Sequence, residues 1–254
     1  MRALSKVPQI TFVFWVMKIC ATTLGETAGD LLSMTLNVGY AISSLILISM
    51  FIVTLVSQLV AKTCHPTLYW MVILSTSTAG TTMSDYMDRT LGLGYLTGTL
   101  ILATILLSVL ALWRFSIGSL SVDHIRGFKV ESFYWTAILF SNTLGTALGD
   151  FLADSSGLGF AGGALLIAGI LAMIVLAHFY TPASKILLFW MAFVLTRPFG
   201  ATAGDLLTKT HEKGGFGFGT IGSSLVLASI LVFFILFATK KHLAEQPVDR
   251  TMPM

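Results

Sequence analysis

Charged residues are scarce in this sequence. Asp, Glu, Lys and Arg make up 11% of its 254 residues, whereas 55% are hydrophobic. Soluble domains contain about 25% charged and about 45–50% apolar residues, so the composition excludes the soluble classes. The lipid bilayer is therefore the expected surrounding, and nothing in the composition predicts nucleic-acid binding.

Cysteine and recognisable catalytic motifs are also lacking. The two cysteines, Cys20 and Cys64, fall in a predicted span and in a loop, which supports neither a disulfide framework nor a metal-binding pair. There is no phosphate-binding loop, nucleophile elbow or zinc-protease helix. These absences argue against an ATP-driven pump within one chain, and they leave no catalytic residue and no organic cofactor to predict.

Hydrophobic runs, by contrast, are long and numerous. Eight of them approach about 20 residues, the length that a membrane-spanning helix requires. No connecting segment is long enough for a globular domain, so the expected fold class is an all-α integral membrane protein with eight transmembrane helices. The first run lacks a cleavage pattern and is expected to be retained. The runs centre on residues 8–28, 39–60, 66–83, 94–113, 133–151, 159–179, 183–204 and 216–237.

The distribution of Lys and Arg predicts the topology, because cytoplasmic loops carry an excess of these residues. Only Arg89, Lys209 and Lys213 fall on one side of the predicted bundle. Both termini are therefore expected in the cytoplasm. The basic residues on the side shared by the termini are Arg2, Lys6, Lys62, Arg114, Arg126, Lys129, Lys185, Lys240, Lys241 and Arg250.

An internal repeat organises the chain. Four tryptophans are each followed ten residues later by a glycine and fifteen residues later by an aspartate. Chance does not produce this register four times, so we interpret the chain as four two-helix repeats, residues 8–62, 66–114, 131–180 and 183–240. The markers are Trp15, Gly25 and Asp30; Trp70, Gly80 and Asp85; Trp135, Gly145 and Asp150; and Trp190, Gly200 and Asp205.

A glycine followed by an aromatic residue is predicted to begin each second helix. The tryptophans are 55, 65 and 55 residues apart, which indicates two halves of two repeats each. The glycine–aromatic pairs are Gly39–Tyr40, Gly94–Tyr95, Gly159–Phe160 and, displaced by one residue, Gly215–Phe216.

The repeat resembles a bacterial family of membrane proteins, a domain of unknown function of the 347 type, usually present in four copies with two transmembrane segments each. The segments FWVMKICATTLGETAGD and FWMAFVLTRPFGATAGD carry the likeness, which covers essentially the whole chain. The resemblance implies a bacterial inner-membrane location and supplies no established activity. The fourth copy departs most, with Arg197 and Pro198 where the others have small polar residues.

Each first helix is expected to turn one polar stripe toward the bundle interior. Every repeat has an even number of spans, so the first helices run parallel, related by pseudo-rotational symmetry about the membrane normal. Positions 0, 3, 7, 11 and 14 from the tryptophan share one helix face, and polar groups in hydrocarbon need partners. The polar members are Lys18, Thr22, Glu26, Ser77, Thr81, Ser84, Asn142, Thr146 and Arg197.

These stripes predict a polar route across the membrane. Ionisable residues are costly inside a bilayer and indicate function, and four aspartates with Glu26 suit a cation. Oxygen ligands favour sodium, magnesium or manganese, and coupled carboxylates add the proton as a candidate. Lys18 and Arg197 would tune the route. Its predicted ion-binding residues are Asp30, Asp85, Asp150, Asp205, Glu26, Lys18, Arg197, Thr22, Ser77, Asn142, Thr81 and Thr146.

Structural roles compete with this interpretation. The aspartates can cap helices at the water interface, the glycines can bring helix backbones close together, and the tryptophans can anchor the protein in the interfacial aromatic belt. Lys18, Glu26 and Arg197 can simply pair, with one another or with an aspartate. The polar residues that follow the aspartates, such as Arg89 and Lys209, are expected in short solvated loops.

Three functional classes remain open. The leading one is a secondary transporter or channel for a small ion or molecule, and a cation is favoured. The alternative is a non-transporting sensor, assembly factor or binder of lipid or another hydrophobic ligand. An intramembrane enzyme, with Glu26 and an aspartate as acid and base, comes third. Four repeats can close into a ring within one chain, so the oligomeric state stays open.

Overall fold

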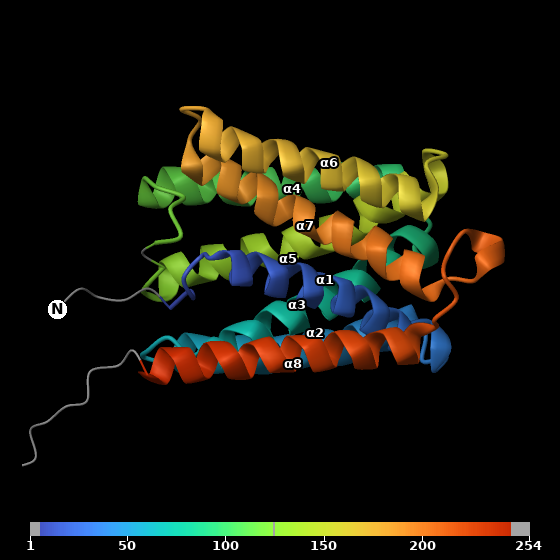
Figure 1. Ribbon diagram of the computed structural model, residues 1–254, viewed down its shortest axis with the longest axis horizontal. Helices are drawn as coiled ribbons and strands as arrows, with labels where there is room; N and C mark the ends of the chain where they lie inside the picture. The colour runs from blue at the N-terminus through green and yellow to red at the C-terminus, as the bar shows by residue number, and fades with distance from the viewer. Residues whose placement is uncertain (1–5, 124, 245–254) are drawn as a thin grey trace, which may run out of the picture.

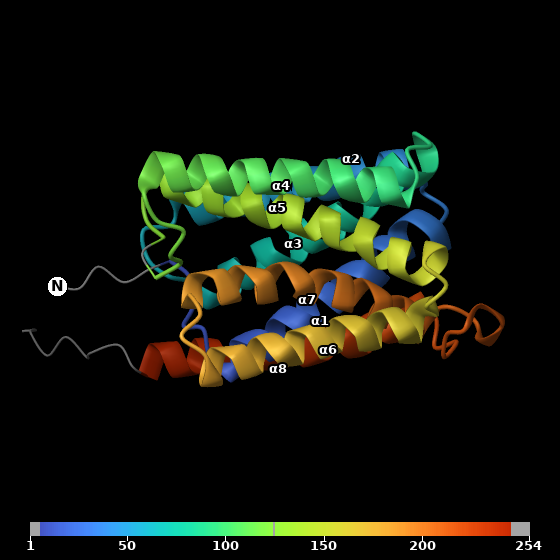
Figure 2. The ribbon, with the colours of Figure 1, turned by 90° about the horizontal axis from the view of Figure 1, so that it is seen from above.

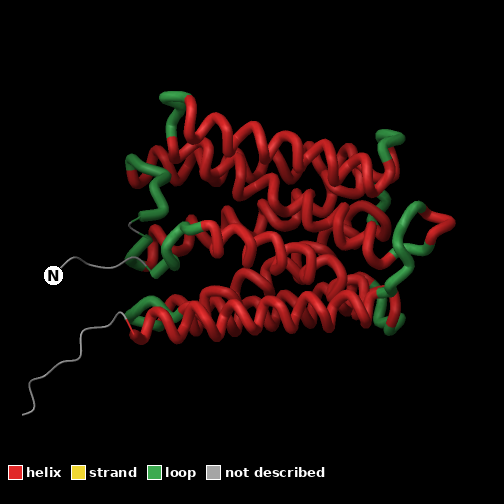
Figure 3. The backbone as a smooth tube through the Cα atoms, in the orientation of Figure 1, coloured by secondary structure: helices red, strands yellow, loops and turns green. Residues whose placement is uncertain are grey.

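The computed structural model describes residues 6–123 and 125–244. Within that part of the chain the regular structure is entirely helical, as Figure 3 shows, which confirms the all-α prediction. The side chains of Arg2, Lys241 and Arg250 lie outside this description. The α-helices of the described residues are α1 (Phe12–Asp30), α2 (Tyr40–Val60), α3 (Pro66–Asp85), α4 (Tyr95–Ile117), α5 (Phe128–Asp150), α6 (Gly159–Tyr180), α7 (Lys185–Thr208) and α8 (Thr220–Ala244).

The first helices of the four repeats form an inner ring. α1 packs against α3, α3 against α5, α5 against α7, and α7 back against α1. Figures 1 and 2 show these four helices lying between the other four and running in the same direction. The predicted arrangement of parallel repeats about a common axis is therefore confirmed.

The second helices form an outer layer, and each one packs on the inner helix of the next repeat. α2 lies on α3, α4 on α5, α6 on α7, and α8 returns to lie on α1. The same neighbours can be followed in Figures 1 and 2. The fourth repeat thus covers the first, and the ring closes within a single chain.

Among the described residues, five helices are individually long and apolar enough to cross a membrane: α2, α4, α6, α7 and α8. The helices α1, α3 and α5 carry more polar side chains because they line the interior of the ring. The outer helices expose large apolar side chains, for example Val53, Leu107 and Phe233. A polar interior inside an apolar outer layer is the arrangement that a lipid surrounding requires.

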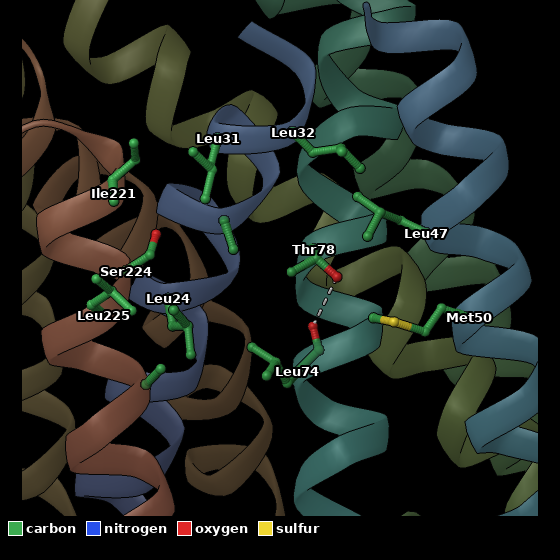
Figure 4. Close-up of a pocket in the computed structure, with 12 residues that line it drawn as sticks. Leu24, Leu31, Leu32, Leu47, Met50, Leu74, Thr78, Ile221, Ser224 and Leu225 are labelled. Carbon is green, nitrogen blue, oxygen red and sulfur yellow. Dashed lines mark hydrogen bonds between the residues drawn. The ribbon is translucent and has the colours of Figure 1, made fainter. Parts of the chain in front are cut away.

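An apolar groove of about 430 Å³ lies between α1, α2, α3 and α8, where the last repeat meets the first. Figure 4 shows Leu225 of α8 on one side of the groove and Met50 of α2 on the other, with Leu24 of α1 between them. The Thr78 hydroxyl beside it donates to its own helix, to the carbonyl of Leu74 at 3.2 Å. The groove therefore takes no part in the polar interior.

The fourth repeat ends its first helix differently from the others. α1, α3 and α5 end at the repeated aspartate and continue into a π-helical turn, whereas α7 runs on to Thr208. The longer loop that follows moves the start of α8 to Thr220, so the prediction of a start at Phe216 is wrong. Gly219 has φ +72°, the same value as Gly94 before α4, so Gly219 is the true counterpart of that glycine. The π-helical turns are Leu31–Thr35, Tyr86–Thr90 and Phe151–Ser155.

The repeated glycines bring neighbouring inner helices into contact. A Cβ atom on Gly80 would lie 2.9 Å from the backbone nitrogen of Thr143 and 3.0 Å from the carbonyl carbon of Asn142. Real Cβ atoms do not approach other atoms so closely, so only glycine fits. The interpretation of these residues as close-packing positions is confirmed. The equivalent contacts join Gly25 to Ser77, Gly145 to Arg197, and Gly200 to Thr22.

Replacing Gly80 with alanine should lower the free energy of unfolding by about 1–3 kcal/mol, the usual cost of overpacking a filled interior, because the obstructing atoms belong to the α5 backbone. The thermal unfolding midpoint of the protein in detergent would report the loss. Gly169→Ala is the matched control, since its Cβ would have no atom within 4 Å. Equal midpoints for the two variants would contradict the close approach of α3 and α5.

Candidate functional site

The polar stripes of the inner helices meet along the axis of the ring. Their side chains are no more than 3% exposed, so the inward orientation predicted from helical periodicity is confirmed. The buried set is Lys18, Thr22, Glu26, Ser77, Thr81, Ser84, Asn142, Thr146 and Arg197.

A buried ion pair occupies the middle of this axis. Arg197 Nη2 lies 2.9 Å from Glu26 Oε2. The same nitrogen donates to the hydroxyls of Thr81 and Thr146, at 2.5 and 2.7 Å. These four residues lie on α7, α1, α3 and α5, so one guanidinium joins all four inner helices. Arg197 and Glu26 therefore pair with each other, as the structural alternative proposed.

Lys18 is buried on the same axis without an ion-pair partner among the described residues. Its Nζ lies 3.4 Å from Asn142 Oδ1 and 4.1 Å from the centre of the Phe193 ring. Asn142 donates in turn to Thr76 Oγ1 at 2.8 Å. An amide oxygen and an aromatic face thus surround the ammonium in place of a carboxylate.

Thr22 and Ser77 occupy packing positions. Thr22 donates to the carbonyl of Thr196 at 3.2 Å and lies against Gly200. Ser77 lies against Gly25, and its hydroxyl has no hydrogen-bond partner within the described part of the chain. These two predicted site residues therefore connect inner helices and do not contact the aspartates.

Lys209 joins two of the repeated aspartates. Its Nζ lies 2.6 Å from Asp30 Oδ2 and 3.0 Å from Asp205 Oδ1. Asp30 ends α1, and Asp205 lies near the end of α7, so the lysine links adjacent helices of the ring. Both aspartates are no more than 4% exposed, and carboxylates buried to this extent need a cationic partner. We call these three residues the Lys209 clamp.

Arg89 joins the other two aspartates. Its Nε lies 3.1 Å from Asp85 Oδ1, and its Nη2 lies 3.1 Å from Asp150 Oδ2. Nη1 donates to the Tyr40 hydroxyl at 3.0 Å. The guanidinium also lies 5.8 and 5.6 Å from the ring centres of Tyr40 and Tyr95. Arg89 is therefore fixed by more partners than Lys209.

The assignment of Arg89 and Lys209 to solvated loops is wrong. Each follows the aspartate of an even-numbered repeat by four residues, the spacing at which side chains meet along a helix. That spacing was the signal in the sequence that could have identified them. In the first and third repeats the same position holds Met34 and Asp154, so the pairing of the aspartates has twofold and not fourfold symmetry.

The interpretation of the aspartates as helix caps is also wrong for Asp30, Asp85 and Asp150. Asp30, Asp85 and Asp150 each precede a π-helical turn, and none of their side chains makes a capping hydrogen bond there. Their carboxylates turn inward to Arg89 and Lys209, whose positive charges compensate the burial of the carboxylates. The aspartates therefore belong to the interior of the ring.

Three carboxylates gather at the Lys209 clamp. Oxygen atoms of Glu26, Asp30 and Asp205 all lie within 4.8 Å of one another. Carboxylate oxygens of this kind are ligands for hard cations such as sodium, magnesium and manganese. Within the described part of the chain this group is the candidate cation site. Lys209 contacts Asp30 and Asp205, whereas Glu26 pairs with Arg197.

Aromatic side chains fill the other end of the ring. Trp70, Trp135 and Trp190 are no more than 5% exposed, so the proposed role in a lipid-facing aromatic belt is wrong for these three. They lie on the inward stripe, and contacts between aromatic rings link each inner helix to the next. Trp15 is partly buried in the same layer. The aromatic layer closes the polar axis at the end where α1 begins.

A closed ring of two-helix repeats, with charges inside and apolar side chains outside, defines an internally repeated helical membrane protein. The family described as Repeat of Unknown Function (DUF347) matches the chain four times, at residues 13–63, 68–118, 133–184 and 188–242. The chain belongs to this family, which confirms the resemblance drawn from the Trp–Gly–Asp register. No curated protein matches the chain, and no solved structure does.

Removing one partner of the Glu26–Arg197 pair should lower the free energy of unfolding by about 3–5 kcal/mol, because a buried charge is left unpaired. The double variant Glu26→Gln/Arg197→Gln should lose clearly less than the sum of the two single losses. Unfolding midpoints of the four proteins in detergent give the double-mutant cycle. Additive losses would mean that the two side chains are not coupled.

Proposed function

We propose that this chain is a secondary transporter for a small cation, with the proton as a candidate coupling ion. The observation that carries the proposal is the Lys209 clamp, in which two buried aspartates hold one ammonium group with Glu26 beside them. A cargo cation can replace that ammonium because the same oxygen atoms would bind it. Lys209 would then neutralise the site whenever the cargo is absent.

Lys209 is better suited to exchange than Arg89. A lysine offers a single ammonium on a flexible stem, whereas an arginine holds carboxylates with a planar fork of donors. Arg89 is further held by Tyr40. Among the described residues, the group of three carboxylates within 4.8 Å of one another is the one at the Lys209 clamp, where Glu26 joins Asp30 and Asp205. We therefore assign cargo binding to the Lys209 clamp and a structural role to Arg89.

The charges along the axis favour a carrier over an open channel. Glu26 compensates the charge of Arg197, but the buried ammonium of Lys18 has no ion-pair partner among the described residues, and its charge between the aspartates and the aromatic layer opposes free passage of a cation. A carrier avoids this barrier by changing conformation around the bound ion. The hydroxyl oxygens of Tyr69 and Tyr134 lie 2.7 Å from each other. Together with Lys18, these hydroxyls provide titratable groups along which a proton could travel.

We place the protein in a bacterial inner membrane with both termini in the cytoplasm. The family resemblance supports the membrane, and the excess of Lys and Arg supports the orientation. Lys62 and Lys185 lie just before α3 and at the start of α7, at the end of the bundle opposite the aspartates. In this orientation the Lys209 clamp lies toward the outer side of the membrane.

A second candidate is a non-transporting membrane protein that binds lipid or another hydrophobic ligand. The groove in Figure 4 favours it, because its lining is apolar and it lies beside the outer helices α2 and α8. In that case the buried charges would only hold the ring together. Cation flux separates the two candidates.

Purified protein in liposomes should carry at least one of sodium, magnesium, manganese or protons faster than empty liposomes do. Asp30→Asn and Asp205→Asn should reduce this flux at least about tenfold, because each removes a cargo ligand and 1.4 kcal/mol already corresponds to that factor. Asp154→Asn is the matched control, since Asp154 is exposed and outside the clamp. Absence of flux for every ion in the folded wild-type protein would exclude the proposal.

Lys209→Gln should lower the cation concentration needed for half-maximal flux by about tenfold or more, because close charge pairs couple by about 1.5 kcal/mol or more and the variant removes the competing ammonium. Arg89→Gln, the matched variant at the other pair, should lower the unfolding midpoint and leave the half-maximal concentration nearly unchanged. The reverse pattern would transfer cargo binding to the Arg89 pair. Flux measured over a range of cation concentrations distinguishes these results.

A further inference from the structure

The π-helical turn after α3 buries a further acidic residue, Asp88. It lies in the turn Tyr86–Thr90, beyond the end of α3, and is 5% exposed. Its Oδ2 accepts a hydrogen bond from the Ser84 hydroxyl at 3.3 Å. Its Oδ1 is buried and has no hydrogen-bond partner within the described part of the chain. Asp88 is therefore a buried carboxyl group that is only half satisfied.

Gly98 of α4 makes room for this carboxyl group. A Cβ atom on Gly98 would overlap Asp88 Oδ1 and would lie 2.8 Å from the carboxyl carbon. The carboxyl group is thus packed directly against the α4 backbone. A metal ion needs several oxygen ligands around it, and the α4 backbone occupies the space beside Oδ1. A proton needs no such space, so a proton is the cation that fits here.

The other repeats have neutral side chains at this position. The third residue after the repeated aspartate is Ser33 in the first repeat, Ala153 in the third and Thr208 in the fourth. All three are no more than 8% exposed. The hydroxyls of Ser33 and Thr208 donate to the helix carbonyl four residues earlier, at 2.8 and 3.0 Å. Packing at this position therefore does not require an acid, and Asp88 adds a property that the other repeats lack.

The charged group next to Asp88 is engaged elsewhere. Arg89 follows Asp88 directly, yet its guanidinium contacts two other carboxylates and a tyrosine hydroxyl. The turn itself packs against α2, α3 and α4. The titratable groups on the turn and on the helices around it are Tyr86, Arg89, Asp85 of α3, Tyr40 of α2, Tyr95 of α4 and Asp150 of α5.

Burial raises the pKa of the Asp88 carboxyl to about 6, whereas the hydrogen bond from Ser84 and the charge of Arg89 act in the opposite direction. An exposed aspartate has a pKa of about 3.9. The packed turn therefore binds a proton more tightly than an open turn would. Rising pH consequently favours the open turn, between about pH 4 and about pH 7, and has little further effect above that range.

We propose that Asp88 is a proton-binding site, and that the Tyr86–Thr90 turn packs on α4 when the proton is bound and opens when it is lost. Protonation removes the charge that burial against Gly98 penalises. Thr90 in the same turn is exposed, so water at this end of the bundle can supply and accept the proton. The inference is independent of cation transport, because Asp88 is not part of the Lys209 clamp.

Hydrogen–deuterium exchange of the full-length protein in detergent, read by mass spectrometry, tests the proposal at pH 5 and pH 8. The reporting amides are Leu91 and Gly94, which donate to backbone carbonyls of the turn. Exchange is expressed relative to that of an unfolded chain at the same pH. On this scale the wild type should exchange about tenfold faster at pH 8 than at pH 5, the ratio that follows from the two pKa values of Asp88.

The first repeat provides a control within the same molecule. Leu36 and Gly39 make the matching hydrogen bonds in its turn, where Ser33 stands in place of the acid. Their relative exchange should be the same at the two pH values. An equal, tenfold change in both turns would overturn the proposal, because the whole bundle would then loosen with pH.

Two neutral variants test the role of Asp88 itself. Asp88→Asn keeps the shape of the protonated carboxyl group, and Asp88→Ser copies the first repeat, so both should exchange equally at pH 5 and pH 8. Asp154→Asn is the matched control and should keep the tenfold change, since Asp154 is an exposed aspartate in the corresponding turn of the third repeat. Equal exchange of the wild type at the two pH values would overturn the proposal. A tenfold change that persists in both Asp88 variants would do so as well, because another group would then be the one that titrates.

Discussion

The whole structure depends on the requirement that polar groups surrounded by hydrocarbon find partners within the protein. Four inner helices carry acidic, basic and hydroxyl side chains along one face, and none of these faces can meet lipid without a large loss of hydration. Closing the helices into a ring lets each face supply the partners of the others. The contact of Arg197 with residues from all three other inner helices is the most direct expression of this requirement.

The backbones of this ring pack with nearly fourfold symmetry, whereas its charged residues are arranged with twofold symmetry. The glycine contacts recur between every pair of adjacent inner helices, so the backbones follow nearly fourfold symmetry. The basic residues that hold the aspartates occur only in the second and fourth repeats, and they differ from each other: Arg89 in one and Lys209 in the other. A repeated scaffold can thus hold two sites of different strength, one firmly fixed and one suited to exchange.

Much of this architecture follows from the sequence because repetition reveals it. The Trp–Gly–Asp register located the repeats, and helical periodicity identified the inward faces. The partners of the aspartates were missed because Arg89 and Lys209 lie beyond the apolar runs, where hydropathy indicates only a loop. The tryptophans were misplaced for a different reason: aromatic belts and aromatic interiors have the same composition, and only the packing of the rings separates them.

Each outer helix packs on the inner helix of the next repeat, and this arrangement affects the order in which the protein can assemble. Of the helices described, α1 is made before all the others, yet the helix that packs on its outer face, α8, follows the other six in the chain. α7 completes the inner ring and covers the polar face of α1, but the outer face of α1 stays uncovered until α8 is inserted. Assembly therefore includes a long-range docking step after translation of the fourth repeat, and the insertion machinery or a chaperone has a defined surface of α1 to protect until that step.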